Sequence, residues 1–148
     1  MPVLAVNRKA AFDYEILETL EAGIQLLGLE VKSVKAGQVN LTGSFVVLRE
    51  GEAFLLNATI PPYQPKNTPP GFDPQRSRKL LLHSSELREL VGTSTRRGLT
   101  LVPLRLYTKN SKIKLEFGVA RRKKKYDQRE VIKRREDERV IRRALRRR

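Results

Sequence analysis

The chain has 148 residues, enough for one domain with a hydrophobic core. It carries 31 Lys and Arg against 16 Asp and Glu, so the net charge is +15 and we expect a polyanionic partner, either nucleic acid or an anionic membrane surface. The absence of cysteine excludes a disulfide framework and a thiolate metal site, and no apolar run approaches the roughly 20 residues of a membrane span. With no secretory signal at its start, the sequence fits a cytoplasmic protein.

The first part of the chain predicts one strand and one ambiguous segment. Residues 1–8 are expected to form a loose arm. Phe12, Tyr14 and Ile16 alternate with acidic residues, which indicates a strand with one buried face. Residues 28–35 suit a short helical turn, although their pattern alone does not decide between a helix and a strand.

The middle of the chain predicts a hairpin followed by a long loop. Residues 44–48 and 53–58 are rich in Phe, Val and Leu, and Gly51 between them supplies the positive φ of a tight turn. Residues 61–74 contain six of the eight prolines. Because proline lacks a backbone donor, neither a helix nor a strand ladder can run through this segment, and we expect a long and partly stiff loop.

A short helix and two strands are predicted next. Leucines 80–82 form an apolar run expected to be buried, and Ser84 or Ser85 is a suitable N-cap for a helix that Gly92 would end. Residues 99–107 resemble a strand in which Pro103 demands an edge or a bulge.

The clearest strand is residues 113–119, where four apolar side chains alternate with polar ones. Short strands and turns of this kind favour a mainly β fold, a small closed or nearly closed β barrel with flanking short helices, spanning residues 1–120.

The last segment, residues 121–148, is a basic C-terminal tail. It holds fifteen Lys or Arg against five Asp or Glu, so 15 − 5 = +10, whereas residues 1–120 hold sixteen against eleven, so 16 − 11 = +5. Its apolar stripe is too thin for a stable isolated helix, so we expect it to be disordered when free and helical when bound. A merely solubilising tail is the less favoured interpretation.

No catalytic constellation is visible, and we expect neither enzymatic activity nor a metal or cofactor. His83 is the only histidine, and by residue type a structural role beside the helix cap is favoured over contact with a base. The basic run 121–125 would bind RNA or DNA with a strong salt dependence. Tyr126 follows it directly and could stack on an unpaired base or pack against the barrel; both interpretations remain open.

The chain resembles the SsrA-binding proteins, also called small protein B, over almost its whole length. The resemblance is carried by the ordered motifs NRKA (7–10), EAGI (21–24), GLEVKS (28–33), GEAFL (51–55), RKLLLH (78–83) and KKYDQR (124–129). It implies an OB-type antiparallel barrel that binds the tRNA-like domain of transfer-messenger RNA and brings it to stalled ribosomes. It implies further that elongation factor Tu joins through the RNA, and that the protein is a monomer with no membrane partner.

The resemblance also implies the residues of two sites. An RNA-binding surface on the barrel would comprise Asn7, Lys9, Glu21, Leu81 and His83.

The tail's approach to the ribosomal decoding centre, built of small-subunit ribosomal RNA, would comprise Lys123, Lys124, Tyr126, Asp127 and Arg129. Several positions depart from the commonest family pattern. Phe12 stands where many members have His and is left out of the site. A structural ribosomal protein, or a general RNA-binding barrel with a basic tail, is the alternative.

Overall fold

The computed structural model describes residues 2–94, 96 and 98–123. The predictions for the tail beyond Lys123, including its disorder, its helical bound form and the roles of Lys124, Tyr126, Asp127 and Arg129, lie outside these residues. None of the described helices is long and apolar enough to cross a membrane.

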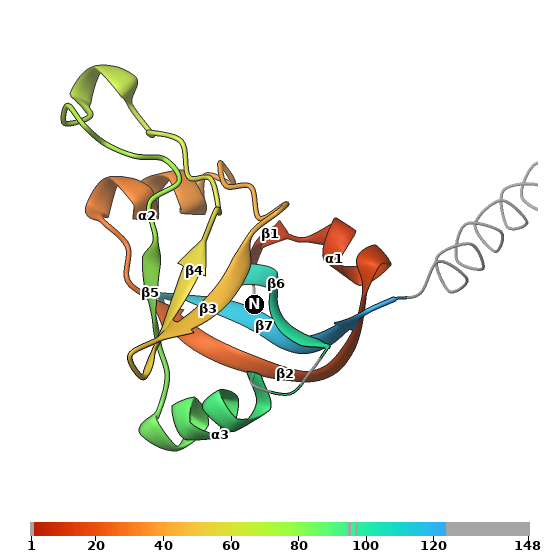
Figure 1. Ribbon diagram of the computed structural model, residues 1–148. Helices are drawn as coiled ribbons and strands as arrows, with labels where there is room; N and C mark the ends of the chain where they lie inside the picture. The colour runs from red at the N-terminus through yellow and green to blue at the C-terminus, as the bar shows by residue number, and fades with distance from the viewer. Residues whose placement is uncertain (1, 95, 97, 124–148) are drawn as a thin grey trace, which may run out of the picture.

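The body is an antiparallel sheet that closes on itself, as Figure 1 shows. Six strands form the ring in the order β7–β6–β3–β4–β5–β2 and back to β7, and a seventh, β1 (Val3–Val6), lies outside β6. The ring strands are β2 (Tyr14–Ile24), β3 (Phe45–Arg49), β4 (Glu52–Leu56), β5 (Arg78–Leu81), β6 (Leu99–Lys109) and β7 (Lys112–Arg122). The predicted small, mainly β barrel is therefore confirmed.

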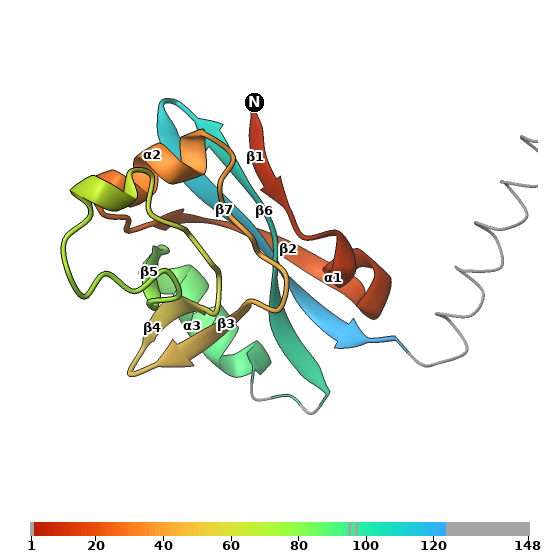
Figure 2. The same cartoon turned by 90° about the horizontal axis from the view of Figure 1, so that it is seen from above.

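Short helices flank the barrel, as predicted. They are α1 (Arg8–Asp13), α2 (Gly28–Lys35) and α3 (Ser84–Ser94), with a single 3-10 turn, η1 (Pro65–Asn67), in the proline-rich loop. Figures 1 and 2 show α1 and α2 on different sides of the barrel, with the end of β7 close to α1. This arrangement leaves distinct surfaces at the two ends of the long strand β2.

Strand β7 provides the centre of the core. Ile113, Leu115, Phe117 and Val119 are buried, as their alternation predicted, while the polar residues Lys112, Lys114 and Glu116 are more exposed. Gly118 is favoured where β7 pairs with β2, because a Cβ there would lie 2.9 Å from Cγ2 of Ile16. The register of the two strands shifts at the same place, just after Ile16.

At two places in the ring, neighbouring strands are joined by very few pairs of residues. β3 pairs with β6 only through Val46 and Leu101. β2 pairs with β5 only through Gly23 with Leu81 and Ile24 with Leu80. The long strands β2, β6 and β7 thus form one leaf and the short strands β3, β4 and β5 another, joined along two narrow seams.

The N-terminal predictions were wrong in two respects. Residues 3–6 form a strand paired with β6 instead of a loose arm, because their apolar side chains add to an otherwise open sheet edge. Phe12 lies in α1 and not in a strand. The side chain of Asn7 accepts a hydrogen bond from the amide of Ala10 and starts the helix, which continues through Phe12. The rest of the predicted strand is confirmed, since Tyr14 and Ile16 lie in β2.

Three further details differ from or refine the sequence interpretation. Leu81 is 48% exposed, so the run 80–82 is not uniformly buried. Helix α3 continues through Gly92 to Ser94, since a helix tolerates one interior glycine at a cost of about 1 kcal/mol. The predicted irregularity at Pro103 is confirmed as a register shift between β6 and β7.

A buried ion pair joins α2 to β5. The side chains of Glu30 and Arg78 are both fully buried, with their closest charged atoms 2.6 Å apart. Arg78 also donates to the carbonyls of Ala58 and Pro74, and Arg76 donates to Glu30 from the other side. Burial by itself would raise the pKa of Glu30, but the hydrogen bonds that it accepts hold the pKa below its usual value.

The proline-rich loop projects from the barrel (Figures 1 and 2). Its two ends are joined to each other, and we call this base the neck of the loop. The amide of Ile60 donates to the carbonyl of Pro74 at 2.9 Å, and the hydroxyl of Ser33 in α2 donates to the carbonyl of Pro61 at 2.6 Å. The loop predicted at residues 61–74 is therefore present, apart from η1, and its base is fastened to the same helix that Glu30 holds.

Glu30→Ala should reduce the free energy of unfolding at pH 7 by about 3–5 kcal/mol, because it leaves Arg78 buried without a counter-charge. The matched control is Glu52→Ala, which removes an exposed pair with Lys79 and should cost only about 0–1 kcal/mol. Urea unfolding measures both. Equal losses in the two variants would contradict the importance of the buried pair.

The pH dependence of the free energy of unfolding should also depend on Glu30. The pKa of the Glu30 carboxyl group is lower in the folded protein than in the unfolded chain. Its contribution to stability is therefore complete at pH values above its pKa in the unfolded chain, and it is lost as the pH falls through its pKa in the folded protein. Wild type should therefore lose more stability on acidification than Glu30→Ala.

Candidate nucleic-acid interface

A groove with a volume of about 740 Å³ opens on the barrel surface where β2, α2, β5 and the β6–β7 turn meet. Its walls come from segments that are far apart in the sequence. They are Glu21, Gly23, Ile24, Leu26, Val31, Lys35, Leu81, Leu82, His83, Glu86, Ser111, Lys112, Ile113 and Lys114. We refer to this set as the groove.

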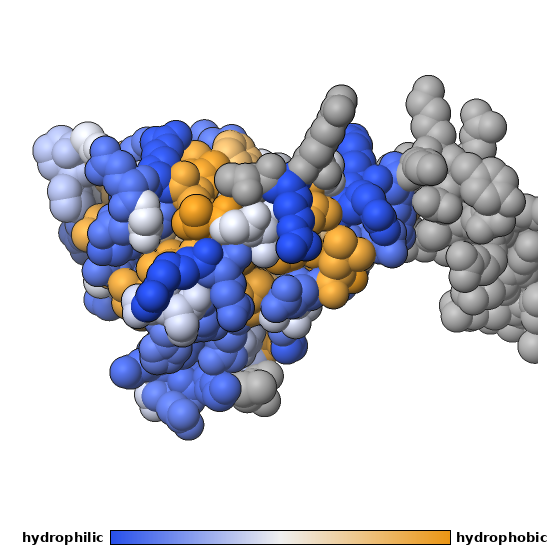
Figure 3. Space-filling view, turned by 60° about the horizontal axis from the view of Figure 1, so that its bottom comes forward, coloured by the Kyte–Doolittle hydropathy of each residue, from blue (hydrophilic) through white to orange (hydrophobic). Residues whose placement is uncertain are grey.

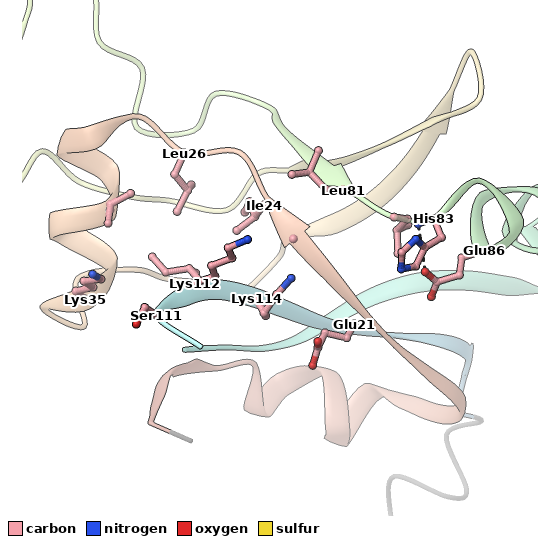
Figure 4. Close-up of a pocket in the computed structure, with 14 residues that line it drawn as sticks. Glu21, Ile24, Leu26, Lys35, Leu81, His83, Glu86, Ser111, Lys112 and Lys114 are labelled. Carbon is pink, nitrogen blue, oxygen red and sulfur yellow. Dashed lines mark hydrogen bonds between the residues drawn. The ribbon is translucent and has the colours of Figure 1, made fainter. Parts of the chain in front are cut away.

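The groove combines apolar surface with a basic rim. Ile24 and Leu81 offer apolar side chains, and Gly23 opposite Leu81 leaves room for it, since a Cβ there would lie 3.2 Å from Cβ of Leu81. Three lysines, Lys35, Lys112 and Lys114, line the groove, and we call them the rim lysines. Figure 4 shows Lys112 and Lys114 reaching into the space between β7 and the strand that carries Leu81.

The carboxylate of Glu21 is held at the edge of the groove by its neighbours. It accepts hydrogen bonds from the hydroxyl of Tyr107, which is buried, and from the amino group of Lys109 at 3.3 Å. The Tyr107 hydrogen bond outweighs partial burial and, with Lys109, lowers the pKa of Glu21. The same contact adds to burial in raising the pKa of Tyr107. Glu21 is thus ionised and already partly neutralised before any ligand binds.

His83 lies at the other end of the groove, at the start of α3. Its amide donates to the carboxylate of Glu86 at 3.2 Å and its carbonyl accepts from the amide of Leu87, so the backbone of His83 begins the helix. The imidazole is exposed and lines the groove (Figure 4). The structural and the binding interpretations of His83 are therefore compatible, since they use different atoms.

The surface of the barrel is mixed in character. On the face seen when the bottom of Figure 1 comes forward, Figure 3 shows apolar side chains reaching the surface across the middle, with strongly hydrophilic residues on either side. An extended polyanion with flat apolar parts matches such a surface, because lysines attract phosphates and apolar side chains contact bases.

The structure does not bring all five predicted barrel residues together. Glu21, Leu81 and His83 line the groove, but Asn7 and Lys9 line a separate depression of about 380 Å³ beside α1. Asn7 is buried, and its side-chain amide donates to the carbonyl of Pro103 at 2.9 Å. Its polar atoms are used within the chain.

Of the tail residues predicted from the sequence, the structure describes only Lys123. Its amide donates to the carbonyl of Asp13 at 2.9 Å and its amino group donates to the carbonyl of Ala11 at 3.1 Å. Lys123 is thus tied to the end of α1.

Sequence reasoning missed the rim lysines. Lys112 and Lys114 were correctly expected to point outward from their strand, but that pattern does not say what they face. Only closure of the barrel brings them opposite Leu81, and only the position of α2 adds Lys35. Among the described residues there is no cluster of three or more His, Cys, Asp and Glu side chains that could hold a metal ion.

Comparison with known proteins gives a consistent result. The model of the SmpB protein family matches residues 4–147. The SsrA-binding protein of Thermosynechococcus vestitus is 52% identical over 146 residues, covering 99% of this chain and 96% of the relative. That of Gloeothece citriformis is 51% identical, covering 95% and 91%.

A solved structure described as "tmRNA-SmpB: a journey to the center of the bacterial ribosome" is also similar. It aligns with a TM-score of 0.69 and 48% identity over 89% of this chain and 95% of the other. The likeness therefore extends from sequence to fold.

Tyr107→Phe should raise the pKa of Glu21 toward its usual value and reduce the free energy of unfolding at pH 7 by about 0.5–1.5 kcal/mol, because a hydrogen bond to a partly exposed carboxylate is lost. A carbon-13 NMR titration of the carboxyl group and urea unfolding measure the two effects. Tyr63→Phe, on the exposed proline-rich loop, is the control and should change stability by less than about 0.5 kcal/mol. An unchanged Glu21 pKa in Tyr107→Phe would show that the contact is unimportant.

Proposed function

The chain belongs to the SmpB family of SsrA-binding proteins, and from that membership we propose that it binds transfer-messenger RNA and delivers it to stalled ribosomes for trans-translation. The observation that carries the proposal is the groove, in which the rim lysines face an exposed apolar side chain across a seam of the barrel. Such a surface can hold a folded RNA through phosphate contacts and through bases that are not paired.

Within the groove we assign different tasks to different residues. The rim lysines attract phosphates, which positions the RNA without reading its sequence. Leu81 and the imidazole of His83 contact bases. Glu21 repels phosphate unless its charge is compensated, and its bonds to Tyr107 and Lys109 provide that compensation. Its remaining acceptor capacity is then available for amino or imino hydrogens of a base edge.

The tail is assigned to the ribosome. Lys124, Asp127 and Arg129 would approach the decoding centre of the small-subunit ribosomal RNA, and Tyr126 would stack there on an unpaired base, a contact worth about 1–3 kcal/mol. In a stalled complex the decoding centre has no codon–anticodon helix, so its bases are free to accept the ring.

Further parts of the proposal concern the assembly. Elongation factor Tu would join through the RNA, the protein would act as a monomer in the cytoplasm, where ribosomes work, and it would catalyse no reaction of its own. The family match supports this view of the assembly. The single histidine and absent cysteine of the sequence support only the expected lack of catalysis.

Binding to transfer-messenger RNA and to ordinary tRNA over a salt series tests the barrel's role. We expect tighter binding to transfer-messenger RNA at every salt concentration. Lys114→Ala should weaken binding and reduce the salt slope by about one unit, because one phosphate contact is lost. His83→Ala should weaken binding about 5- to 150-fold with an unchanged slope.

Arg49→Ala is the matched control, since this exposed arginine at the end of β3 does not line the groove. It should leave transfer-messenger RNA binding close to that of wild type. Equal affinity for the two RNAs, or equal effects of Arg49→Ala and Lys114→Ala, would reduce the protein to a general basic RNA binder.

Two truncations test the division between barrel and tail, which the sequence places after residue 120. β7 continues to Arg122 and pairs there with the start of β2. A chain ending at Lys123 should therefore fold, bind transfer-messenger RNA and fail in rescue, whereas a chain ending at Ala120 should be less stable. Thermal unfolding and peptidyl transfer to alanyl transfer-messenger RNA measure these properties. Equal stability of the two chains would support the division at 120.

A further inference from the structure

The last residues of β7 are fixed to the start of β2, and the residue that follows β7 is fixed to the first helix. Arg122 lies over the ring of Tyr14, with 5.9 Å between the guanidinium carbon and the ring centroid, and Arg121 pairs with Glu15 at 3.0 Å. Beyond them, Lys123 donates its amide to Asp13 and its amino group to Ala11, as described above. The carbonyls at the end of a helix lack partners within the helix, so these donors satisfy groups that would otherwise need water.

The helix that receives Lys123 is itself held to the barrel. The backbone amide of Asn7 donates to the carbonyl of Leu104 at 2.8 Å, and its side-chain amide donates to the carbonyl of Pro103. Its side-chain oxygen, Oδ1, accepts from the amide of Ala10 and so caps α1. Ala10 is buried and packs in one cluster with Val102 of β6 and Ala120 of β7. Contacts made by Asn7, Ala10 and Lys123 therefore form a continuous series. The series leads from β6 through α1 to the start of the tail.

This joint lies at the opposite end of β2 from the groove. β2 begins at Tyr14, which pairs with Arg122, and ends at Gly23 and Ile24, which line the groove. A strand rises by roughly 3.3 Å per residue, so the two sites lie up to about 30 Å apart along it. One strand thus connects the surface that would hold the RNA to the point where the tail leaves (Figure 1).

We propose that α1 sets the direction in which the tail leaves the barrel, with Asn7 and Lys123 acting as positioning residues and not as contacts to RNA. The inference rests on the proposed function, because a fixed direction matters only if the groove and the tail act on two partners at once. A protein that bridges transfer-messenger RNA and a ribosome needs a defined angle between its two binding regions. Contacts that restrict this angle reduce the ordering that must occur on the ribosome.

The experiment uses the full-length chain with Asn7→Ala, Lys123→Met and Lys123→Arg. Asn7→Ala leaves the charge of the tail intact. Lys123→Met removes the donor but keeps the apolar stem, and Lys123→Arg keeps a donor and serves as the conservative control. Circular dichroism first establishes that each variant is folded.

Three measurements follow on each variant. Transfer-messenger RNA affinity should stay within about twofold of wild type, because the groove is unchanged. The rate of peptidyl transfer to alanyl transfer-messenger RNA on ribosomes with an empty decoding site should fall at least about tenfold in Asn7→Ala and Lys123→Met, since a small misplacement is costly. Lys123→Arg should keep the rate of peptidyl transfer close to that of wild type.

The third measurement is the distance distribution between spin labels. Because the chain has no cysteine, Lys32→Cys and Lys125→Cys give two unique labelling sites. The distribution should be broader in Asn7→Ala and Lys123→Met than in the otherwise unchanged labelled protein, and Lys123→Arg should leave it narrow.

Several outcomes would overturn the proposal. A loss of transfer-messenger RNA affinity in Asn7→Ala with an unchanged distance distribution would make Asn7 an RNA contact. A loss of rescue in Lys123→Met but not in Asn7→Ala would make Lys123 a ribosome contact. If wild type failed to bind transfer-messenger RNA while the distributions still broadened, the joint would stand and the proposed function would fail.

Discussion

The wall of the groove depends on the buried ion pair between Glu30 and Arg78. Glu30 is fully buried in α2, and through Arg78 and Arg76 it connects this helix to β5 and to the residues just before that strand. Arg78 extends the connection to the neck of the proline-rich loop. Because moving α2 away from β5 would leave buried charges unpaired, the ion pair opposes such a displacement. Lys35 and Leu81, which these two elements carry, thereby face the same space.

The molecule has one surface at each end of its longest strands. Glu21 belongs to the end that holds the groove, and Tyr14 belongs to the end that meets the tail. Strands β2 and β7 remain paired from one end to the other, apart from a single shift in register. The paired strands β2 and β7 therefore separate two basic regions by the length of β2.

Much of this fold could be predicted from the sequence, because local patterns carried it. The alternation of residues 113–119, the glycine turn at Gly51 and the prolines of the loop each reflect a local rule of backbone geometry. The short segments at the N-terminus could not be predicted in the same way. Val3–Val6 becomes a strand because β6 offers it an edge. Asn7, in the predicted loose arm, caps a helix that extends to Asp13 and so includes Phe12, where the alternation indicated a strand.

The site was predicted less completely than the fold. The family motifs pointed to Glu21, Leu81 and His83, which the structure places together, and also to Asn7, which it places elsewhere. The rim lysines carry no local signal, since an outward lysine on a strand is ordinary. Their significance comes from the closure of the sheet, a long-range property that no short pattern contains.

The two seams of the ring give the barrel an uneven resistance to opening. A leaf attached by so few backbone pairs can separate from its neighbour at a lower free energy than global unfolding requires, so its amide hydrogens exchange with solvent sooner. The groove lies across one of these seams, with Gly23 on one leaf and Leu81 on the other. A molecule that contacts both Gly23 and Leu81 would join the two leaves at this seam, and its binding would then raise the free energy needed to open the seam.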